Sequence, residues 1–234
     1  MSRRAEVLAE MGIAPLWRLR SKVVTNESSS SHDGWIPLKA AVSGCTKCGL
    51  HKTRTQTVFG VGDENADWML IGEAPGAEED RLGDPFVGQA GRLLDNMLAA
   101  IGLSRRENVY IANVLKCRPP GNRNPAPEEV EQCSPHLLKQ IELIKPKLIV
   151  TLGRYSLAWF FPRDSISKVH GHLRRQNGTY FLHMYHPAAA LHAGNLRKTI
   201  EDDFRKIPQA LAKIGQAEQP ALVAEAATEQ MRLF

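Results

Sequence analysis

The four cysteines of this 234-residue chain constrain its fold most, because they form two pairs that lie far apart in the sequence. Cys45 and Cys48 are separated by two residues, and Cys117 and Cys133 are separated by fifteen. Thiolates in such pairs are typical metal ligands, so we expect all four to meet at one metal centre. The fold must then bring the start of the domain against its middle.

Disulfide bonds are the alternative use of these cysteines. The chain opens with MSRRAEVLAEMG and shows no apolar run typical of a signal peptide, which favours a cytosolic protein, where disulfides are rare. A bond between Cys45 and Cys48 would also close too short a loop to stabilise the fold. Thiolates are soft ligands that suit both zinc and an iron–sulfur cluster, so ligand softness does not decide between the two. The wide second pair is unlike a zinc knuckle and favours the cluster slightly.

Composition indicates one sizeable globular domain with tails. The chain is 43% hydrophobic and 24% charged, and no stretch approaches the roughly 18 apolar residues of a membrane span. The net charge of +5 is a mild indication of a nucleic-acid partner, because phosphate contacts need Lys and Arg. A generic basic surface explains the same charge equally well.

The chain divides into three regions. Residues 1–36 are expected to be a flexible leader, with an amphipathic stretch and then a Ser-rich polar run from Asn26 to Gly34. Residues 37–213 alternate strand-like and helix-like patterns. Residues 214–234 have the low complexity of a tail. The middle region is therefore the expected folded domain.

Apolar runs in the middle region predict four strands, at Trp68–Ile71, Val109–Val114, Leu148–Leu152 and Tyr180–Tyr185. Helical spacing predicts helices at Gly91–Ile101, Pro127–Ile144, Gly153–Phe161 and Leu196–Ile214. Strands that alternate with helices indicate a parallel sheet between helical layers. We therefore expect an α/β fold of three layers, α/β/α, around a central, mainly parallel four-stranded sheet.

Polar residues follow three of these strands, at the end where parallel sheets bind their ligands. The first strand leads to Glu73 and then to Glu79 and Asp80, the second ends at Asn113, and the fourth leads to His186. Carboxylates, an amide and an imidazole are thus expected to converge on one rim of the sheet. Each residue alone also has a structural explanation, and their coincidence is what favours a functional site.

Four motifs occur in order along the chain: GEAPGAEED at residues 72–80, PFVG at 85–88, NVLKCRPP at 113–120 and HPA at 186–188. They resemble the motif series of the family 4 uracil-DNA glycosylases, the bacterial and archaeal enzymes with a [4Fe–4S] cluster. The resemblance covers about residues 41–212 and includes the cysteine spacing. It implies the uracil-glycosylase fold, a [4Fe–4S] cluster on the four cysteines, and excision of uracil from DNA by a monomer in base excision repair.

The resemblance also implies a role for each motif residue. Phe86 would stack on the flipped base, and Asn113 would pair with its O4 and its N3–H and so reject cytosine. His186 would donate to O2 as the uracil anion leaves. Glu79 matches a position near C5, where its side chain would crowd the methyl group of thymine.

One departure concerns the carboxylate that stabilises the sugar cation. Ala74 occupies the position where family 1 enzymes carry their catalytic Asp, and family 4 commonly has a small residue there. The negative charge must then come from Glu73 or from the pair Glu79 and Asp80. We favour Glu73.

Other residues are expected to contact DNA outside the base. Leu191 and His192 follow the HPA motif where the family carries its intercalating loop, and an apolar wedge there would fill the hole that the flipped base leaves. Basic residues close to the cysteines in sequence suit phosphate contacts, namely Lys52, Arg54, Arg118 and Arg123.

The C-terminal residues, Gln230-Met231-Arg232-Leu233-Phe234, resemble the pentapeptide with which bacterial repair and replication proteins dock on the DNA sliding clamp. Met231, Leu233 and Phe234 are apolar residues at the end of a polar tail, where no core is available to them. A groove on a partner could bury them, with Gln230 adding a directional hydrogen bond. The alternatives are a tail that folds back on the domain and a chance match.

Two other functions fit parts of the sequence. One is a non-enzymatic iron–sulfur or zinc module that binds nucleic acid in a replication complex, but this leaves Asn113 and His186 without a role. The other is a nucleotide-binding or hydrolytic enzyme that uses the loop at residues 72–76 for phosphate. That loop lacks the Gly-Lys-Ser/Thr ending and carries acids where phosphate would lie, which favours uracil excision.

Overall fold

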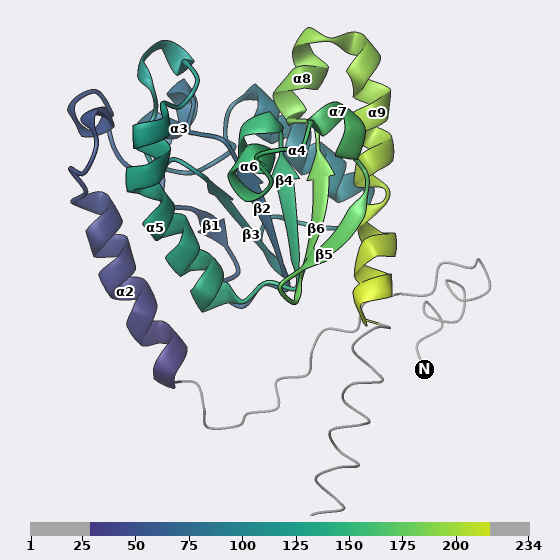
Figure 1. The fold of residues 1–234 in the computed structure, drawn as a ribbon, viewed down its shortest axis with the longest axis horizontal. Helices are drawn as coiled ribbons and strands as arrows, with labels where there is room; N and C mark the ends of the chain where they lie inside the picture. Colours follow the sequence, from purple (N-terminus) through teal and green to yellow (C-terminus); the bar gives the residue numbers. More distant parts are fainter. Residues whose placement is uncertain (1–28, 216–234) are drawn as a thin grey trace, which may run out of the picture.

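A six-stranded sheet with helices on both faces forms the centre of the protein (Figure 1). The computed structural model describes residues 29–215, with side chains from residue 34 onwards. The strands are β1 (Val61–Gly62), β2 (Trp68–Gly72), β3 (Val109–Asn113), β4 (Leu148–Leu152), β5 (Leu173–Gln176) and β6 (Thr179–Met184). Their order is β1-β3-β2-β4-β6-β5, and the four inner strands are parallel. The expected α/β fold is confirmed.

The two edge strands were not predicted, so the sheet has six strands where the sequence predicts four. β1 is only two residues long, and β5 reads LRRQ, so neither carries the apolar run of a buried strand. Both pair antiparallel with their neighbours. The turn Asn177-Gly178, with φ of 49° and 83°, joins β5 to β6, and this dipeptide is the signal that could have found the hairpin.

The α-helices are α2 (Ser29–Ser43), α3 (Ala77–Leu82), α4 (Gln89–Ala100), α5 (Pro127–Ile144), α6 (Arg154–Phe160), α7 (Ile166–Val169), α8 (Pro187–His192) and α9 (Gly194–Phe204), with short 3-10 helices η1 (Gly49–Lys52) and η2 (Pro120–Asn122). The last expected helix is interrupted at residues 205–206 and resumes over 207–215. Pro208 lies in the first turn of the resumed helix, where its missing N–H removes no hydrogen bond. None of the described helices is long and apolar enough to cross a membrane.

Side chains of the inner strands alternate between two apolar cores. Trp68 and Leu70 of β2 pack with α4 and α9 on one face of the sheet, whereas Met69 and Ile71 pack with α2, α5 and α6 on the other. Helices α2 and α5 lie side by side on that second face (Figure 1). Because both faces are covered, β2, β3 and β4 are buried along their whole length, which explains their continuous apolar runs.

The folded domain begins earlier than the sequence predicts. α2 starts at Ser29, inside the expected leader, and its Trp35 is buried with its ring 5.5 Å from that of Tyr110. An aromatic ring of this size buries enough apolar surface to anchor the helix. At the other end Ile214 is buried, one residue beyond the expected limit. The amphipathic stretch of the leader and the clamp-like pentapeptide lie outside the described residues.

Candidate functional site

The carboxyl ends of the parallel strands place the expected polar residues at one edge of the sheet. Asn113, the last residue of β3, pairs in register with Gly72, the last residue of β2. His186 follows β6 and is the N-terminal cap of α8, which lies at this end of the sheet (Figure 1). Gly153, directly after β4, passes so close that a Cβ there would lie 3.0 Å from the Cβ of His186. Motifs that are distant in sequence are therefore neighbours in space.

Gly72 allows Asn113 and Phe86 to approach each other. A Cβ at Gly72 would collide with Oδ1 of Asn113 and would lie 2.6 Å from Cζ of Phe86. Asn113 is only 3% exposed, and its Oδ1 has no hydrogen-bond partner among the described residues. A buried acceptor without a donor costs free energy unless a ligand supplies one. The Asn113 amide is thus free to accept a hydrogen bond from a ligand.

Phe86 is held in a backbone conformation that L-residues rarely adopt, with φ of 55°. Its ring stacks on that of His186, with the centroids 5.5 Å apart and 25° between the planes. Arg105 donates to the Phe86 carbonyl at 2.7 Å and is itself fixed by Asp95 at 2.6 Å. A Cβ at Gly91 would collide with the same carbonyl. Arg105 and Gly91 hold the strained residue in place, and sequence reasoning missed both because each acts on the backbone of another segment.

The backbone determines the tautomer of His186. The N–H of Ala188 donates to His186 Nδ1 at 3.2 Å, so the neutral ring carries its proton on Nε2. Burial lowers the pKa of His186 to about 4, against the opposing effect of the Glu79 carboxylate. At neutral pH the ring is therefore an uncharged N–H donor, which suits it to stabilise a developing oxyanion.

The Glu79 carboxylate organises the loop that carries Phe86. One oxygen accepts the N–H groups of Val87 at 2.9 Å and Gly88 at 2.8 Å, and the other accepts the N–H of Gly76 at 3.1 Å. Glu79 thus joins the start of α3 to the loop before α4. Because the Gly76 N–H already donates to Glu79, it is not available to bind a phosphate, which disfavours the nucleotide-binding alternative.

The other two candidate carboxylates have different surroundings. Asp80 is buried, and both of its oxygens accept the N–H of Thr55, at 3.0 and 3.1 Å. It therefore ties α3 to the segment that follows the first cysteine pair. Glu73 is half-buried directly after β2, and burial raises its pKa to about 7, although Arg154 opposes this shift. A carboxyl group with a pKa near neutrality is suited to proton transfer.

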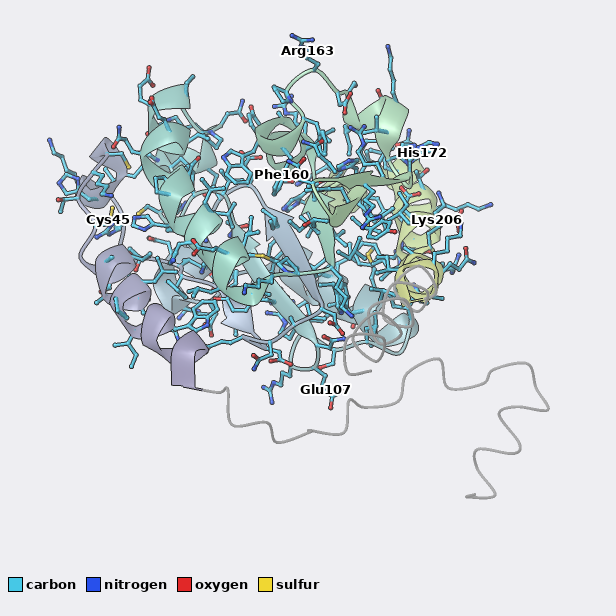
Figure 2. All side chains as sticks on the ribbon, turned by 60° about the horizontal axis from the view of Figure 1, so that its bottom comes forward. Cys45, Glu107, Phe160, Arg163, His172 and Lys206 are labelled. Carbon is cyan, nitrogen blue, oxygen red and sulfur yellow. The ribbon has the colours of Figure 1, made fainter. Side chains whose placement is uncertain are left out.

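All four cysteines are free thiols that line one hollow, formed by the end of α2, η1, the segment after β3, and α5. Figure 2 shows Cys45 at this end of α2, close to α5. Arg54 donates to the Cys117 sulfur at 3.1 Å, and the backbone N–H of Lys116 donates to the Cys133 sulfur at 3.2 Å. Donors of this kind stabilise thiolate ligands.

The hollow suits a centre held by thiolates. Burial raises the pKa of Cys117 and raises that of Cys133 to about 11, so their thiolates need a cation beside them. No three His, Cys, Asp or Glu side chains of the described residues are close enough to hold a single ion, whereas four sulfur atoms share this hollow. Ala74 packs against the same side chains, so the motif loop after β2 adjoins the hollow.

The residues expected to contact DNA divide into two sets. Leu191 and His192 are exposed at the end of α8, beside the site. Lys52 is exposed near the cysteine hollow. Arg54, Arg118 and Arg123 are instead engaged within the protein, by a cysteine sulfur, an asparagine and a glutamate respectively. These arginines therefore serve partly to hold the fold.

The model of the uracil DNA glycosylase superfamily matches residues 59–212, and the chain belongs to this superfamily. Within it, the chain groups with the type-4 uracil-DNA glycosylases. It is 48% identical over 190 residues to the type-4 enzyme of Archaeoglobus fulgidus, and this match covers 77% of this chain and 93% of the relative. The type-4 enzyme of Thermotoga maritima is 43% identical over 179 residues, and this match covers 74% of this chain and 93% of the relative. A DNA polymerase of Bacillus phage SP01 is 30% identical over 171 residues, covering 73% of this chain and 18% of the polymerase.

Proposed function

We propose that this protein flips uracil out of DNA and hydrolyses its N-glycosidic bond, leaving an abasic site. The observation that carries the proposal is the buried Asn113 Oδ1, which has no partner among the described residues and lies beside the ring of Phe86. An oriented amide there accepts the N3–H of uracil and donates to O4, whereas cytosine presents the opposite pattern. The Phe86 ring offers a face on which the base stacks.

Bond cleavage produces a uracil anion and a sugar with oxocarbenium character. His186 donates its Nε2–H to O2 and stabilises the anion. Glu73 stabilises the sugar cation, orients the water that bonds to C1′ and accepts its proton. Glu79 lies fixed near C5, where it would exclude the thymine methyl group. Leu191, with His192 beside it, fills the hole left in the DNA.

Single-turnover excision on a uracil-containing oligonucleotide tests the proposal. Asn113→Asp should reduce uracil excision strongly, because a carboxylate cannot donate to O4. Asn177→Asp is the matched control, since it lies in the β5–β6 turn at the opposite end of β6 from the site. His186→Ala should lower the rate by ~10²–10³ with little loss of DNA affinity. Undiminished excision by Asn113→Asp would contradict the assignment.

A [4Fe–4S] cluster held by the four cysteines is part of the proposal. It is supported by the shared hollow and by the N–H donors that point to two of the sulfur atoms. When bound, the cluster would supply a cross-link between the end of α2 and the segment from β3 to α5. Protein purified anaerobically should be brown, absorb near ~400 nm and contain about four iron atoms per chain. Stoichiometric zinc would contradict the cluster.

The pentapeptide at residues 230–234 is proposed to dock on a bacterial sliding clamp, through Gln230, Met231, Leu233 and Phe234. Tethering would raise the local enzyme concentration at replicating DNA without altering the active site. Deleting residues 230–234 should abolish binding to purified clamp and leave excision on a free oligonucleotide unchanged. Full-length protein that fails to bind clamp at high micromolar concentration would exclude docking.

A further inference from the structure

Lys116 places an ammonium group in the interior, directly behind the base-recognition site. The residue is 1% exposed, and its Nζ donates to the backbone carbonyl of Asn113 at 2.9 Å and to Oε1 of Gln140 at 2.6 Å. Both acceptors are neutral, and no carboxylate among the described residues pairs with this Nζ. A buried charge without an opposite charge nearby is costly, so the position needs another explanation.

Gln140 is a rigid acceptor for this ammonium. Its amide nitrogen donates to the carbonyl of Phe59 at 2.9 Å and to the hydroxyl of Tyr110 at 3.3 Å. The amide oxygen therefore faces Lys116 in one orientation only. The Nζ is held between α5 and the end of β3, and its contact with the Asn113 carbonyl is correspondingly fixed.

The negative charge that would match Lys116 is that of the proposed cluster on the four cysteines. The backbone N–H of Lys116 donates to the sulfur of Cys133, the next residue is Cys117, and Lys116 is one of the residues that line the cysteine hollow. The ammonium of Lys116 also interacts electrostatically with Cys133. A [4Fe–4S] core with four thiolate ligands carries net negative charge. Such a cluster would lie against the ammonium in a region of low dielectric, where the attraction is strong.

We infer that Lys116 is a positioning residue that couples the cluster to uracil recognition. The cluster's negative charge keeps the ammonium in the interior, and the ammonium fixes the Asn113 carbonyl and thereby the direction of the Asn113 amide. This inference rests on the proposed function, and it gives a structural cluster a specific effect on the active site. Removing the Lys116 charge should change both the reduction potential of the cluster and the affinity for uracil, although Lys116 contacts neither the base nor DNA.

The experiment compares Lys116→Met with the wild-type protein, both loaded with iron. The cluster reduction potential is measured by a titration followed by electron paramagnetic resonance, and the affinity for free uracil by inhibition of excision. In Lys116→Met the potential should become more negative, because loss of a nearby positive charge favours the oxidised cluster. Uracil affinity should fall about tenfold, the scale of a lost hydrogen bond to a charged group. Affinity for abasic DNA should not change.

Two further variants test whether the effect depends on the buried charge of Lys116 or on the net charge of the protein. Lys116→Arg keeps the charge and should retain a potential near that of the wild type. Lys139→Met removes the same charge from the surface of α5, where Lys139 pairs with Glu142, and should leave both measurements unchanged. If Lys116→Met fails to take up iron, the reduction potential is measured on Lys116→Gln instead. Its side chain is neutral but keeps an N–H donor.

A Lys116→Met or Lys116→Gln protein with the wild-type potential and wild-type uracil affinity would overturn the role of Lys116. Iron-free wild-type protein, or wild-type protein without uracil excision, would instead overturn the proposed function. The two failures are therefore distinct.

Discussion

Phe86 stacks on His186, with the ring centroids 5.5 Å apart, although one residue lies in the loop before α4 and the other begins α8. The ring that we propose stacks on the base and the ring that we propose donates a proton thus support each other.

Replacing Phe86 with Ala should lower kcat/KM for uracil excision about 10- to 100-fold, because base stacking on an aromatic ring contributes roughly 1–3 kcal/mol. Phe86→Tyr keeps the ring face and should retain most of the activity. Rates are measured on a single-stranded uracil oligonucleotide. Equal kcat/KM for Phe86→Ala and the wild type would exclude stacking as the role of this ring.

Gly72→Ala should abolish most uracil excision, because the new Cβ would collide with Asn113 Oδ1 and crowd the Phe86 ring. Gly194→Ala is the matched control, since a Cβ there meets no atom within 4 Å. The measurement is the single-turnover rate of both variants, with circular dichroism to verify the fold. A Gly72→Ala enzyme as active as Gly194→Ala would show that the close approach at Gly72 is not needed.

Arg105→Gln should reduce excision about tenfold, because Phe86 loses the charged donor that holds its carbonyl. Affinity for abasic DNA should persist. Arg106→Gln, which alters the exposed neighbouring residue, serves as the control. If the two variants behave alike, the conformation of Phe86 does not depend on Arg105.

Excision should become faster as the pH rises through about 7. Burial raises the pKa of Glu73 to about 7, so the carboxyl group is neutral below this pH and ionised above it. Only the ionised form stabilises the sugar cation and accepts a proton from water. Glu73→Gln should be slow at every pH and lack this inflection. Glu107→Gln alters an exposed residue just before β3, at the opposite end of that strand from the site, and should keep the inflection. A wild-type profile that is flat from pH 5.5 to 8 would exclude Glu73 as the group that titrates.

The free energy of unfolding should decrease as the pH falls from about 6.5 towards 4. His183 is fully buried on β6 beside Thr151, and burial lowers its pKa to about 4. The unfolded chain therefore binds a proton in this range that the folded protein does not, which favours unfolding at low pH. Urea titrations at pH 7 and pH 5 should show a smaller difference for His183→Gln than for the wild type. The exposed His192→Gln should match the wild type, and an equal pH dependence in all three proteins would remove His183 from this effect.

Local patterns explain why most of the fold could be predicted. The inner strands are buried on both faces, so each appears as an uninterrupted apolar run, and α5 begins at Pro127 with acids in its first turn as predicted. Such signals depend on neighbours in the sequence. β5 was missed because an edge strand with one exposed side has no apolar run, and α2 was missed because its polar start resembles a linker.

By itself, the sequence determined the order of the four inner strands and of the helices that alternate with them, the expectation that the four thiols meet, and the residues that end the strands, because spacing and residue type carry that information. Only the tertiary structure decided how those residues are used. It placed the Glu79 and Asp80 carboxylates on backbone N–H groups, oriented His186 through the Ala188 N–H, and buried Lys116 between Asn113 and the cysteines. These contacts join segments that are distant in the chain. They depend on strand register and on which charges lose contact with water, and no local pattern records either.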